Sequence, residues 1–361
     1  MELLSVTMND GVKPRSEIEG KDNSSEDKSN YKIVRKGDMV YNSMRMWQGA
    51  NGISPCDGIV SPAYTVLMPK QEINNGYFAA LFKSANLINE FRKNSQGMTP
   101  DTWNLKYPQI ETIKIQIPSV SEQDKVSELF GVLDARIVAQ AQLVESLKKY
   151  KRGLLRIVFS EKGSHSLLHD AVSHRIDEVC DVLSGKRIPK GETFSPRPTE
   201  YRYITVSDMG EKYVSSDTLQ FITSHTEKQI TRYKVRNGDI IISVAGTLGK
   251  LNIITPDLDG VNLTENCDRF TNFRGINPEY LYHVLSSDLI QSQIEASKTK
   301  NGQPKLALER IRNFVVPVPH QIGQEQFVGV MNSIDKYIAS QQAVLDMCCK
   351  ARAGLQQQLF I

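Results

Sequence analysis

The chain has 361 residues, enough for two or three domains that each bury a hydrophobic core. Hydrophobic residues make up 40% and charged residues 24%, a globular composition that excludes disorder as the main state. Lys and Arg number 44 against 41 for Asp and Glu, so a nucleic-acid partner would need a local basic surface. The five scattered cysteines disfavour a disulfide scaffold and a zinc site. With neither a membrane-length apolar run nor a signal peptide, the sequence predicts a soluble protein of the reducing cytoplasm without a membrane partner.

The sequence repeats itself at an offset of 201 residues. Gly37-Asp38 matches Gly238-Asp239, and the same offset continues without a gap between residues 113–159 and 314–360. The Gly-Asp motif lies 75 residues before the second stretch, so chance does not explain the shared offset. The identities in that stretch include Pro118/Pro319, Gln123/Gln324, Asp134/Asp335, Gln140/Gln341, Gly153/Gly354 and Phe159/Phe360.

The matching stretches predict two long helices. Residues 113–117 alternate apolar and polar side chains, which predicts a strand that ends at Pro118. Ser121 with Asp124 offers an N-cap for a proline-free helix of about 35 residues. Helices of this length need a long partner, so we expect an antiparallel coiled coil; the alternative is that each helix packs on its own domain. The predicted apolar stripes are Val126, Leu129, Phe130, Leu133, Ile137, Val144 and Leu147, and Phe327, Val330, Met331, Ile334, Ile338, Leu345 and Cys348.

The remaining segments, 1–112 and 176–313, have an α+β pattern of short strands and turns. Strands are predicted at 203–206, 240–244 and 250–254, and short helices at 77–91 and 280–294. The latter two match after a shift of two residues, since Tyr77-Phe78 corresponds to Tyr280-Leu281. Residues 15–30 are charged and serine-rich, which predicts a surface loop, and 160–175 form a linker.

A search for catalytic chemistry gives no residue or metal site above background. Gly246-Thr247-Leu248-Gly249-Lys250 has the wrong spacing for a nucleotide phosphate loop. A turn after Ser243 whose amides, Thr247 and Lys250 face a DNA phosphate is a better use of these residues. The sequence also contains no nucleophile elbow.

The polar inventory instead favours nucleic-acid binding. Arg bonds to guanine and Asn or Gln to adenine, while Trp can pack on sugar or base. Lysines in a loop suit phosphate oxygens. The alternative for each residue is an ordinary solvated loop. The candidates are Asn42, Ser43, Arg45, Trp47 and Gln48 in the first half, the basic turn with Lys186, Arg187 and Lys190, and the loop with Lys298, Lys300, Asn301, Gln303 and Lys305.

The ends of the two repeats resemble a known family. Each half has a Gly-Asp strand, then a stretch ending in Glu-Gln (115–123 and 316–326), then a long helix. Each helix ends in Lys-x3-Gly-Leu-x4-Phe, from Lys149 to Phe159 and from Lys350 to Phe360. Over nearly its full length the chain resembles the specificity subunit of a Type I restriction–modification system.

This resemblance implies a non-catalytic subunit that reads a split site in double-stranded DNA with two domains separated by the helices. It implies two modification subunits with adenine methyltransferase activity, and restriction subunits; S-adenosylmethionine, ATP and Mg²⁺ would belong to those partners, and this chain would hold no cofactor. The runner-up is a coiled-coil DNA-binding regulator or adaptor that acts without a methyltransferase. The implied division is a first target-recognition domain (1–112), a first long helix (113–160), a linker (161–175), a second target-recognition domain (176–313) and a second long helix (314–361).

The offset also predicts an incomplete first domain. Met1 matches Arg202, by which point the second domain has run through about 25 residues, including 176–182 and the basic turn at 186–190. Apolar surface would then stay uncovered in residues 1–112. We therefore expect this half to be the less stable one and the weaker reader of DNA.

Overall fold

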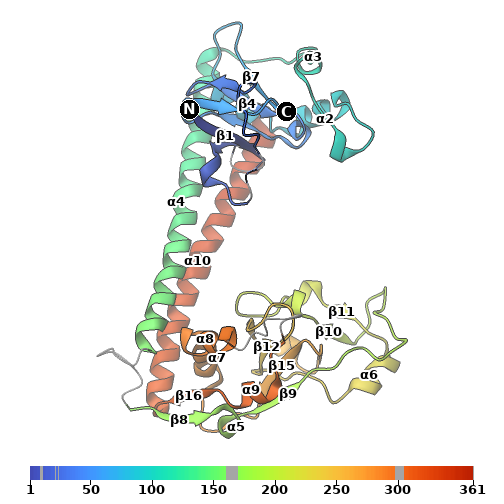
Figure 1. The fold of residues 1–361 in the computed structure, drawn as a ribbon, viewed down its shortest axis with the longest axis vertical. Coiled ribbons are helices and arrows are strands. Elements are labelled where there is room, and N and C mark those ends of the chain that lie inside the picture. The colour runs from blue at the N-terminus through green and yellow to red at the C-terminus, as the bar shows by residue number, and fades with distance from the viewer. Residues whose placement is uncertain (9–10, 21, 23, 160–169, 297–304, 361) are drawn as a thin grey trace. The chain divides into compact units, whose positions relative to one another are not determined.

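The computed structural model describes residues 1–8, 11–20, 22, 24–159, 170–296 and 305–360. It divides into two compact units (Figure 1): unit 1 comprises Met1–Val144 and Ser340–Ile361, and unit 2 comprises Glu145–Ala339. Each unit holds one α+β segment and parts of both long helices, so the predicted α+β repeat is confirmed. No helix within the described ranges is both long and apolar enough to cross a membrane.

Unit 1 contains short strands and helices ahead of the first long helix. They are β1 (Glu2–Thr7), β2 (Gly11–Pro14), β3 (Lys32–Val34), β4 (Met39–Asn42), β5 (Asn51–Ile53), β6 (Gly58–Val60), β7 (Tyr64–Leu67), α1 (Asn75–Leu81), α2 (Ala85–Asn94) and α3 (Tyr107–Ile110), with 3-10 turns at Arg15–Glu17, Met46–Gln48 and Pro100–Thr102. The two sheets have the orders β2-β1-β6-β3 and β5-β4-β7. The single helix predicted at 77–91 is two helices, because Ser84 caps a second one through the amide of Leu87.

Unit 2 repeats this arrangement and adds to it. Its elements are β8 (Val172–Arg175), α5 (Ile176–Val179), β9 (Asp181–Ser184), β10 (Arg202–Ile204), β11 (Gln220–Phe221), α6 (Ser224–Ile230), β12 (Ile240–Ser243), β13 (Leu251–Ile253), β14 (Asn262–Leu263), β15 (Cys267–Thr271), α7 (Pro278–Ser286), α8 (Asp288–Ala296), α9 (Leu308–Arg312) and β16 (Val315–Val318), with 3-10 turns at Val206–Asp208, Ser216–Thr218 and Pro256–Leu258. The sheets have the orders β11-β10-β14, β13-β12-β15-β9 and β16-β8. The strands predicted near 203, 240 and 250 are present, whereas the helix predicted at 280–294 is interrupted at Ser287.

The repeated Gly-Asp motif forms the turn that starts the central strand of each unit. Gly37 and Gly238 have φ of +91° and +82°, a region that glycine adopts without steric cost. The aspartate closes the turn: Asp38 accepts a hydrogen bond from the Arg35 amide, and Asp239 accepts one from the Arg236 amide, both at 2.8 Å. The motif therefore fixes where β4 and β12 begin.

The long helices are α4 (Val120–Val158) and α10 (Gln321–Leu359), and their bounds differ by the predicted offset. The predicted N-cap at Ser121 is wrong. Ser119 forms the cap instead, because its Oγ and amide both bond to the Glu122 carboxylate, at 2.8 and 3.1 Å. In the apolar stripes, Leu129 and Val330 are 41% and 55% exposed, so both equivalent positions face away from the packed side.

A buried glutamine joins each long helix to its unit. Gln123 accepts a hydrogen bond from the Asn74 amide (3.0 Å) and donates one to the Pro118 carbonyl (2.9 Å). Gln324 makes the same pair of bonds, accepting from the Asn277 amide (2.7 Å) and donating to the Pro319 carbonyl (2.9 Å). Both glutamines are at most 2% exposed, so each ties the first turn of its helix to the helix that precedes it.

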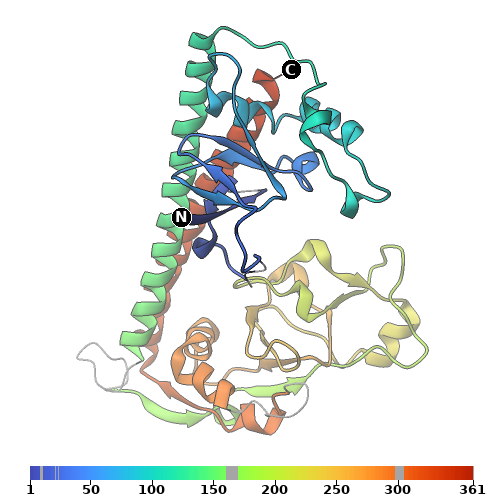
Figure 2. The same cartoon turned by 45° about the horizontal axis from the view of Figure 1, so that its top comes forward.

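Within each unit α4 and α10 pack antiparallel (Figures 1 and 2). In unit 1, Phe130 stacks on Phe360 with ring centroids 5.9 Å apart, Asp134 pairs with Arg352, and Gln140 donates to the Gln341 side chain at 2.9 Å. Residue numbers rise along α4 as they fall along α10, which confirms the predicted orientation. In unit 2, Lys151 pairs with Asp335, and these are the residues that the offset matches to Arg352 and Asp134.

The strand predicted at 113–117 is absent, although its equivalent in unit 2 is β16. β16 forms because β8 pairs with it, from Val315 opposite Arg175 to Val318 opposite Val172. Among the described residues of unit 1, 113–117 have no such partner. Apolar alternation therefore fails here because a strand also needs a neighbouring strand for its backbone hydrogen bonds.

Candidate nucleic-acid interface

Three loops of unit 2 meet at one edge of its four-stranded sheet. Ser243 at the end of β12 lies opposite Cys267 at the start of β15, and Asp268 lies opposite Ser184 at the end of β9. The loops after β9, after β12 and before β15 therefore converge. We call residues 185–190, 244–250, 264–266 and 305 the loop edge of unit 2.

Backbone hydrogen bonds hold these loops together. The Val244 amide donates to the Asn266 carbonyl at 2.8 Å, and the Leu306 amide donates to the Val244 carbonyl at 2.9 Å. Ala245 forms an isolated β-bridge with Lys305. The structure thus brings together three groups of candidates that are far apart in sequence: Lys186 with Arg187, Thr247 with Lys250, and Lys305.

The side chains at this edge have different degrees of freedom. Arg187 bonds to Glu265 at 2.6 Å, which raises the pKa of the guanidinium, while the Lys186 ammonium lies 5.7 Å from the centre of the Tyr233 ring. Lys250 donates to the Met209 carbonyl. Lys186, Arg187, Thr247 and Lys305 are exposed and can meet a ligand, and Lys190 is exposed further along its loop.

Ser243 does not fit the predicted contact with DNA. It is fully buried, and its Oγ accepts a hydrogen bond from the Lys250 amide at 3.0 Å. The side chain therefore shapes the turn from inside. Behind the same edge, burial raises the pKa of the Asp268 carboxyl to about 6, with Lys305 and Arg312 acting in the opposite direction.

Unit 1 has an equivalent loop edge, formed by residues 43–50, 61–63 and 104–106. The Ser43 amide donates to the Ala63 carbonyl at 3.2 Å, and the Leu105 amide donates to the Ser43 carbonyl at 2.8 Å. These are the bonds of Val244 and Leu306 shifted by 201 residues. The backbone frame of the two loop edges is therefore the same.

The side chains on the loop edge of unit 1 are different. Arg45 is exposed, whereas Asn42 accepts a hydrogen bond from the Met44 amide at 3.0 Å. Trp47 packs edge-on against Trp103 with centroids 5.1 Å apart, and the Arg92 guanidinium lies 5.7 Å from its ring. Gln48, next in the chain, is half-buried. Ser43 is buried and bonds to Thr65 at 3.1 Å, so like Ser243 it is unsuited to a direct contact.

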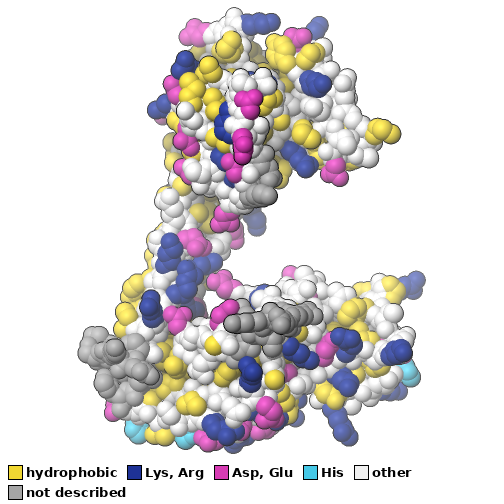
Figure 3. Space-filling model, viewed as in Figure 1, with side chains coloured by type: hydrophobic (Ala, Val, Ile, Leu, Met, Phe, Trp, Pro, Cys, Tyr) yellow, Lys and Arg dark blue, Asp and Glu magenta, His cyan; other side chains and the backbone are white. Residues whose placement is uncertain are grey.

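Sequence reasoning missed several residues at these edges. The offset pairs Lys305 with Asn104, and that signal was available. Lys32, Asn104 and Lys106 line a hollow of about 340 Å³ beside Ser43. No sequence signal links Trp103 to Trp47. Lys298, Lys300, Asn301 and Gln303 lie outside the described residues. On the face of each unit that Figure 3 shows, basic and acidic side chains are interspersed, which agrees with a local basic footprint.

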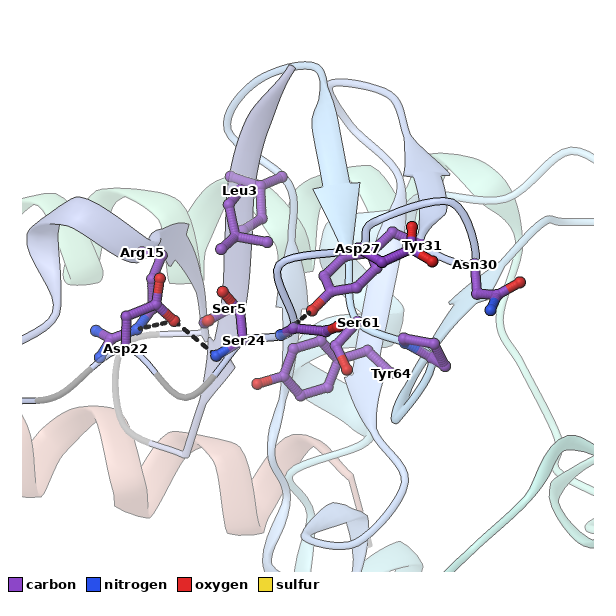
Figure 4. Close-up of a pocket in the computed structure, with 13 residues that line it drawn as sticks. Leu3, Ser5, Arg15, Asp22, Ser24, Asp27, Asn30, Tyr31, Ser61 and Tyr64 are labelled. Atoms are coloured by element: carbon purple, nitrogen blue, oxygen red, sulfur yellow. Dashed lines mark hydrogen bonds and ion pairs between the residues drawn. The ribbon is translucent and has the colours of Figure 1, made fainter.

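A cavity of about 550 Å³ in unit 1 is a poor candidate for a phosphate (Figure 4). Asp22 lies in it, 3.7 Å from Arg15, and accepts a hydrogen bond from the Ser24 amide that lowers its pKa. Asp27 also lines it, so two carboxylates would repel an anion. Within the described ranges there is likewise no cluster of His, Cys, Asp and Glu suited to a metal ion.

Comparisons with known proteins agree with the repeat. The profile of the Type I restriction modification DNA specificity domain matches residues 5–149 and 169–346. The Type I restriction enzyme MjaVIII specificity subunit of Methanocaldococcus jannaschii is 23% identical over 346 residues, which cover 91% of this chain and 79% of that protein. The Type I restriction enzyme EcoBI specificity subunit of Escherichia coli is 24% identical over 232 residues, 62% of this chain and 47% of that protein.

Two solved structures have a similar fold. A chain from a structure concerned with complex assembly and conformational transition of the type I R-M system gives a TM-score of 0.60 at 18% identity, covering 93% of this chain and 84% of that one. The S subunit of a Type I restriction-modification system from M. genitalium gives 0.55 at 16% identity, covering 91% and 84%. At these identities the likeness establishes the fold alone.

Proposed function

The chain belongs to the Type I restriction modification DNA specificity family, and on that premise we propose that its two units each read one half of a split DNA site. It is the non-catalytic DNA-recognition subunit of a complex whose methyltransferase and restriction subunits carry the chemistry. Two modification subunits per chain, and S-adenosylmethionine, ATP and Mg²⁺ bound only by partners, are parts of the proposal.

One observation supports the split site above all others. The loop edges share their backbone hydrogen bonds, Leu105 to Ser43 and Leu306 to Val244, yet carry different side chains. A common frame with different polar groups suits two readers of different base sequences. Linking two readers multiplies their discrimination, because binding of one holds the other at high local concentration.

Substitutions at each loop edge test this proposal in the complex reconstituted with a modification subunit and S-adenosylmethionine. Arg45→Ala is expected to weaken one half-site, and Lys186→Ala with Lys305→Ala the other. A lost base contact costs about 1–3 kcal/mol of discrimination, and each lost phosphate contact lowers the salt slope by about 0.9. Methylation of DNA libraries varied at every position reads out both effects.

The chain provides matched controls for these variants. Arg35→Ala and Arg236→Ala remove exposed cations at the opposite ends of β4 and β12, 201 residues apart. They are expected to leave both half-sites unchanged. Methylation by the isolated chain, or tight site-specific binding that is indifferent to the modification subunit, would instead favour an enzyme or a free-standing regulator.

We further propose that α4 and α10 set the spacing between the half-sites. Gln140 bonds to its own repeat equivalent, Gln341, which supports a pseudo-twofold pairing of the helices. Inserting four residues after each glutamine adds about one helical turn, roughly 5.4 Å or one and a half base pairs. A longer methylated spacer with both half-sites retained is expected; an unchanged spacer in an active complex would contradict this role.

A further inference from the structure

The outer edge of β7 differs from its equivalent in unit 2. β15 pairs with β9 along four residue pairs, from Asp268 opposite Ser184 to Thr271 opposite Asp181. β7 is the last strand of the sheet β5-β4-β7, and no described residue of unit 1 pairs with its outer side. An open strand edge presents backbone donors and acceptors to which another strand can add.

The segment 113–117 is unpaired in the same way. Its equivalent, β16, pairs with β8. The consequence is visible at one matched position: Ile115 is 37% exposed, whereas Val316 is fully buried. Unit 1 thus has two unfilled strand positions, and in unit 2 one continuous segment, Val172–Ser184, fills both of their equivalents.

Between its strands, that segment also covers the core of unit 2. Ile176, Val179, Cys180 and Val182 are all buried in the main hydrophobic cluster. The corresponding core of unit 1 has five side chains that are only partly buried, and each has a buried counterpart in unit 2. The pairs are Ile53 and Ile253, Leu67 and Phe270, Phe78 and Leu281, Ile113 and Phe314, and Val126 and Phe327.

We propose that β7 and 113–117 form a docking surface for a strand–helix–strand segment of a second polypeptide. Unit 2 defines the chemistry of this occupant, since Val172–Ser184 shows what covers the same place in the repeat. The occupant presents one strand to 113–117, apolar side chains from a helical turn to the open core, and a second strand to β7. Main-chain hydrogen bonds supply affinity, and the apolar positions supply specificity.

Titration of a labelled peptide with the sequence Val172–Ser184 into the full chain tests the proposal. Saturable binding is expected, with amide exchange at Tyr64–Leu67 and 113–117 slowed at least tenfold. A peptide carrying Ile176→Asp and Val182→Asp, which keeps the length but loses the apolar positions, is expected not to bind. Equal binding by both peptides, or no protection at these two segments, would overturn the proposal.

Two protein variants locate the binding on the surface. Ile115→Asp is tolerated by the fold because the side chain is already exposed, and it is expected to abolish peptide binding. Val132→Asp, on the 63% exposed surface of α4, is the matched control and is expected to leave binding unchanged. If the chain alone forms a dimer that Ile115→Asp dissociates, the occupant is a second copy pairing edge to edge, and the proposed segment is wrong.

Discussion

Units 1 and 2 share their internal connections but differ in how well their cores are covered. The Gly-Asp turn, the helix-anchoring glutamine and the loop-edge hydrogen bonds recur at the same offset. The sheet next to these features has three strands in unit 1 and four in unit 2. The loop frame therefore does not depend on the fourth strand, whose contribution is to cover the core.

The helix pair differs in the same direction. The ion pair of Asp134 with Arg352 in unit 1 matches that of Asp335 with Lys151 in unit 2. In unit 2, Lys212 from the α+β segment also reaches Asp335, at 3.2 Å. Unit 2 thus binds its helices through a charge network as well as through a packed core.

The largest expected effect comes from the aromatic residue near the end of each long helix. Phe159 packs on Phe327 at 5.5 Å between centroids, and Phe360 packs on Tyr77 at 5.4 Å. Truncation of a buried Phe costs about 3–5 kcal/mol. Phe159→Ala is expected to speed amide exchange in unit 2 and Phe360→Ala in unit 1. Faster exchange in both units from either variant would show that they unfold together.

The glutamine anchors provide a smaller and symmetric test. Gln123→Ala and Gln324→Ala each leave a buried backbone amide without its acceptor, which costs about 1–3 kcal/mol. We expect similar losses in the local free energy of unfolding, measured by amide exchange at Asn74 and Asn277. A loss confined to one variant would mean that the two clamps, despite equal geometry, do not carry equal load.

Acid titration separates the units further. Asp268 has a folded pKa of about 6 against an ordinary 3.8, so the folded state holds its proton more tightly. Its favourable contribution is present below pH 3.8 and is lost as the pH rises through 6. Asp268→Asn is thus expected to stabilise unit 2 by about 1–2 kcal/mol at pH 8 and not at pH 3.5. Thr65 is its counterpart in unit 1, which should show no such dependence.

Limited proteolysis measures the difference between the units directly. The partly buried core of residues 1–112 predicts that the first cuts fall there, about tenfold faster than in 176–313, a ratio that corresponds to about 1.4 kcal/mol of local stability. Mass spectrometry of early fragments identifies the sites. Equal resistance of both segments would show that the uncovered residues have no weight in stability.

The repeat and the two helices could be predicted because they depend on local pattern: identities at one offset, helical spacing and the absence of proline. The failures involve partners distant in the chain. Residues 113–117 alternate correctly but have no neighbouring strand, and Ser43 and Ser243 follow their strands at positions that face inward. Lys250 looked suited to a phosphate, yet the Met209 carbonyl, 41 residues earlier, takes its ammonium.

The contact of Phe360 with Tyr77 also orders events during synthesis. Unit 2 is one continuous stretch, so it can fold once residue 339 has left the ribosome. Unit 1 is made first but has to wait for Phe360 and for Gln356, which donates to the Ala80 carbonyl at 3.0 Å. At roughly 5–20 residues per second, the 248 residues from 112 to 360 take about 12–50 s. The nascent first domain therefore spends that interval with its core open, and the domain translated first is completed last.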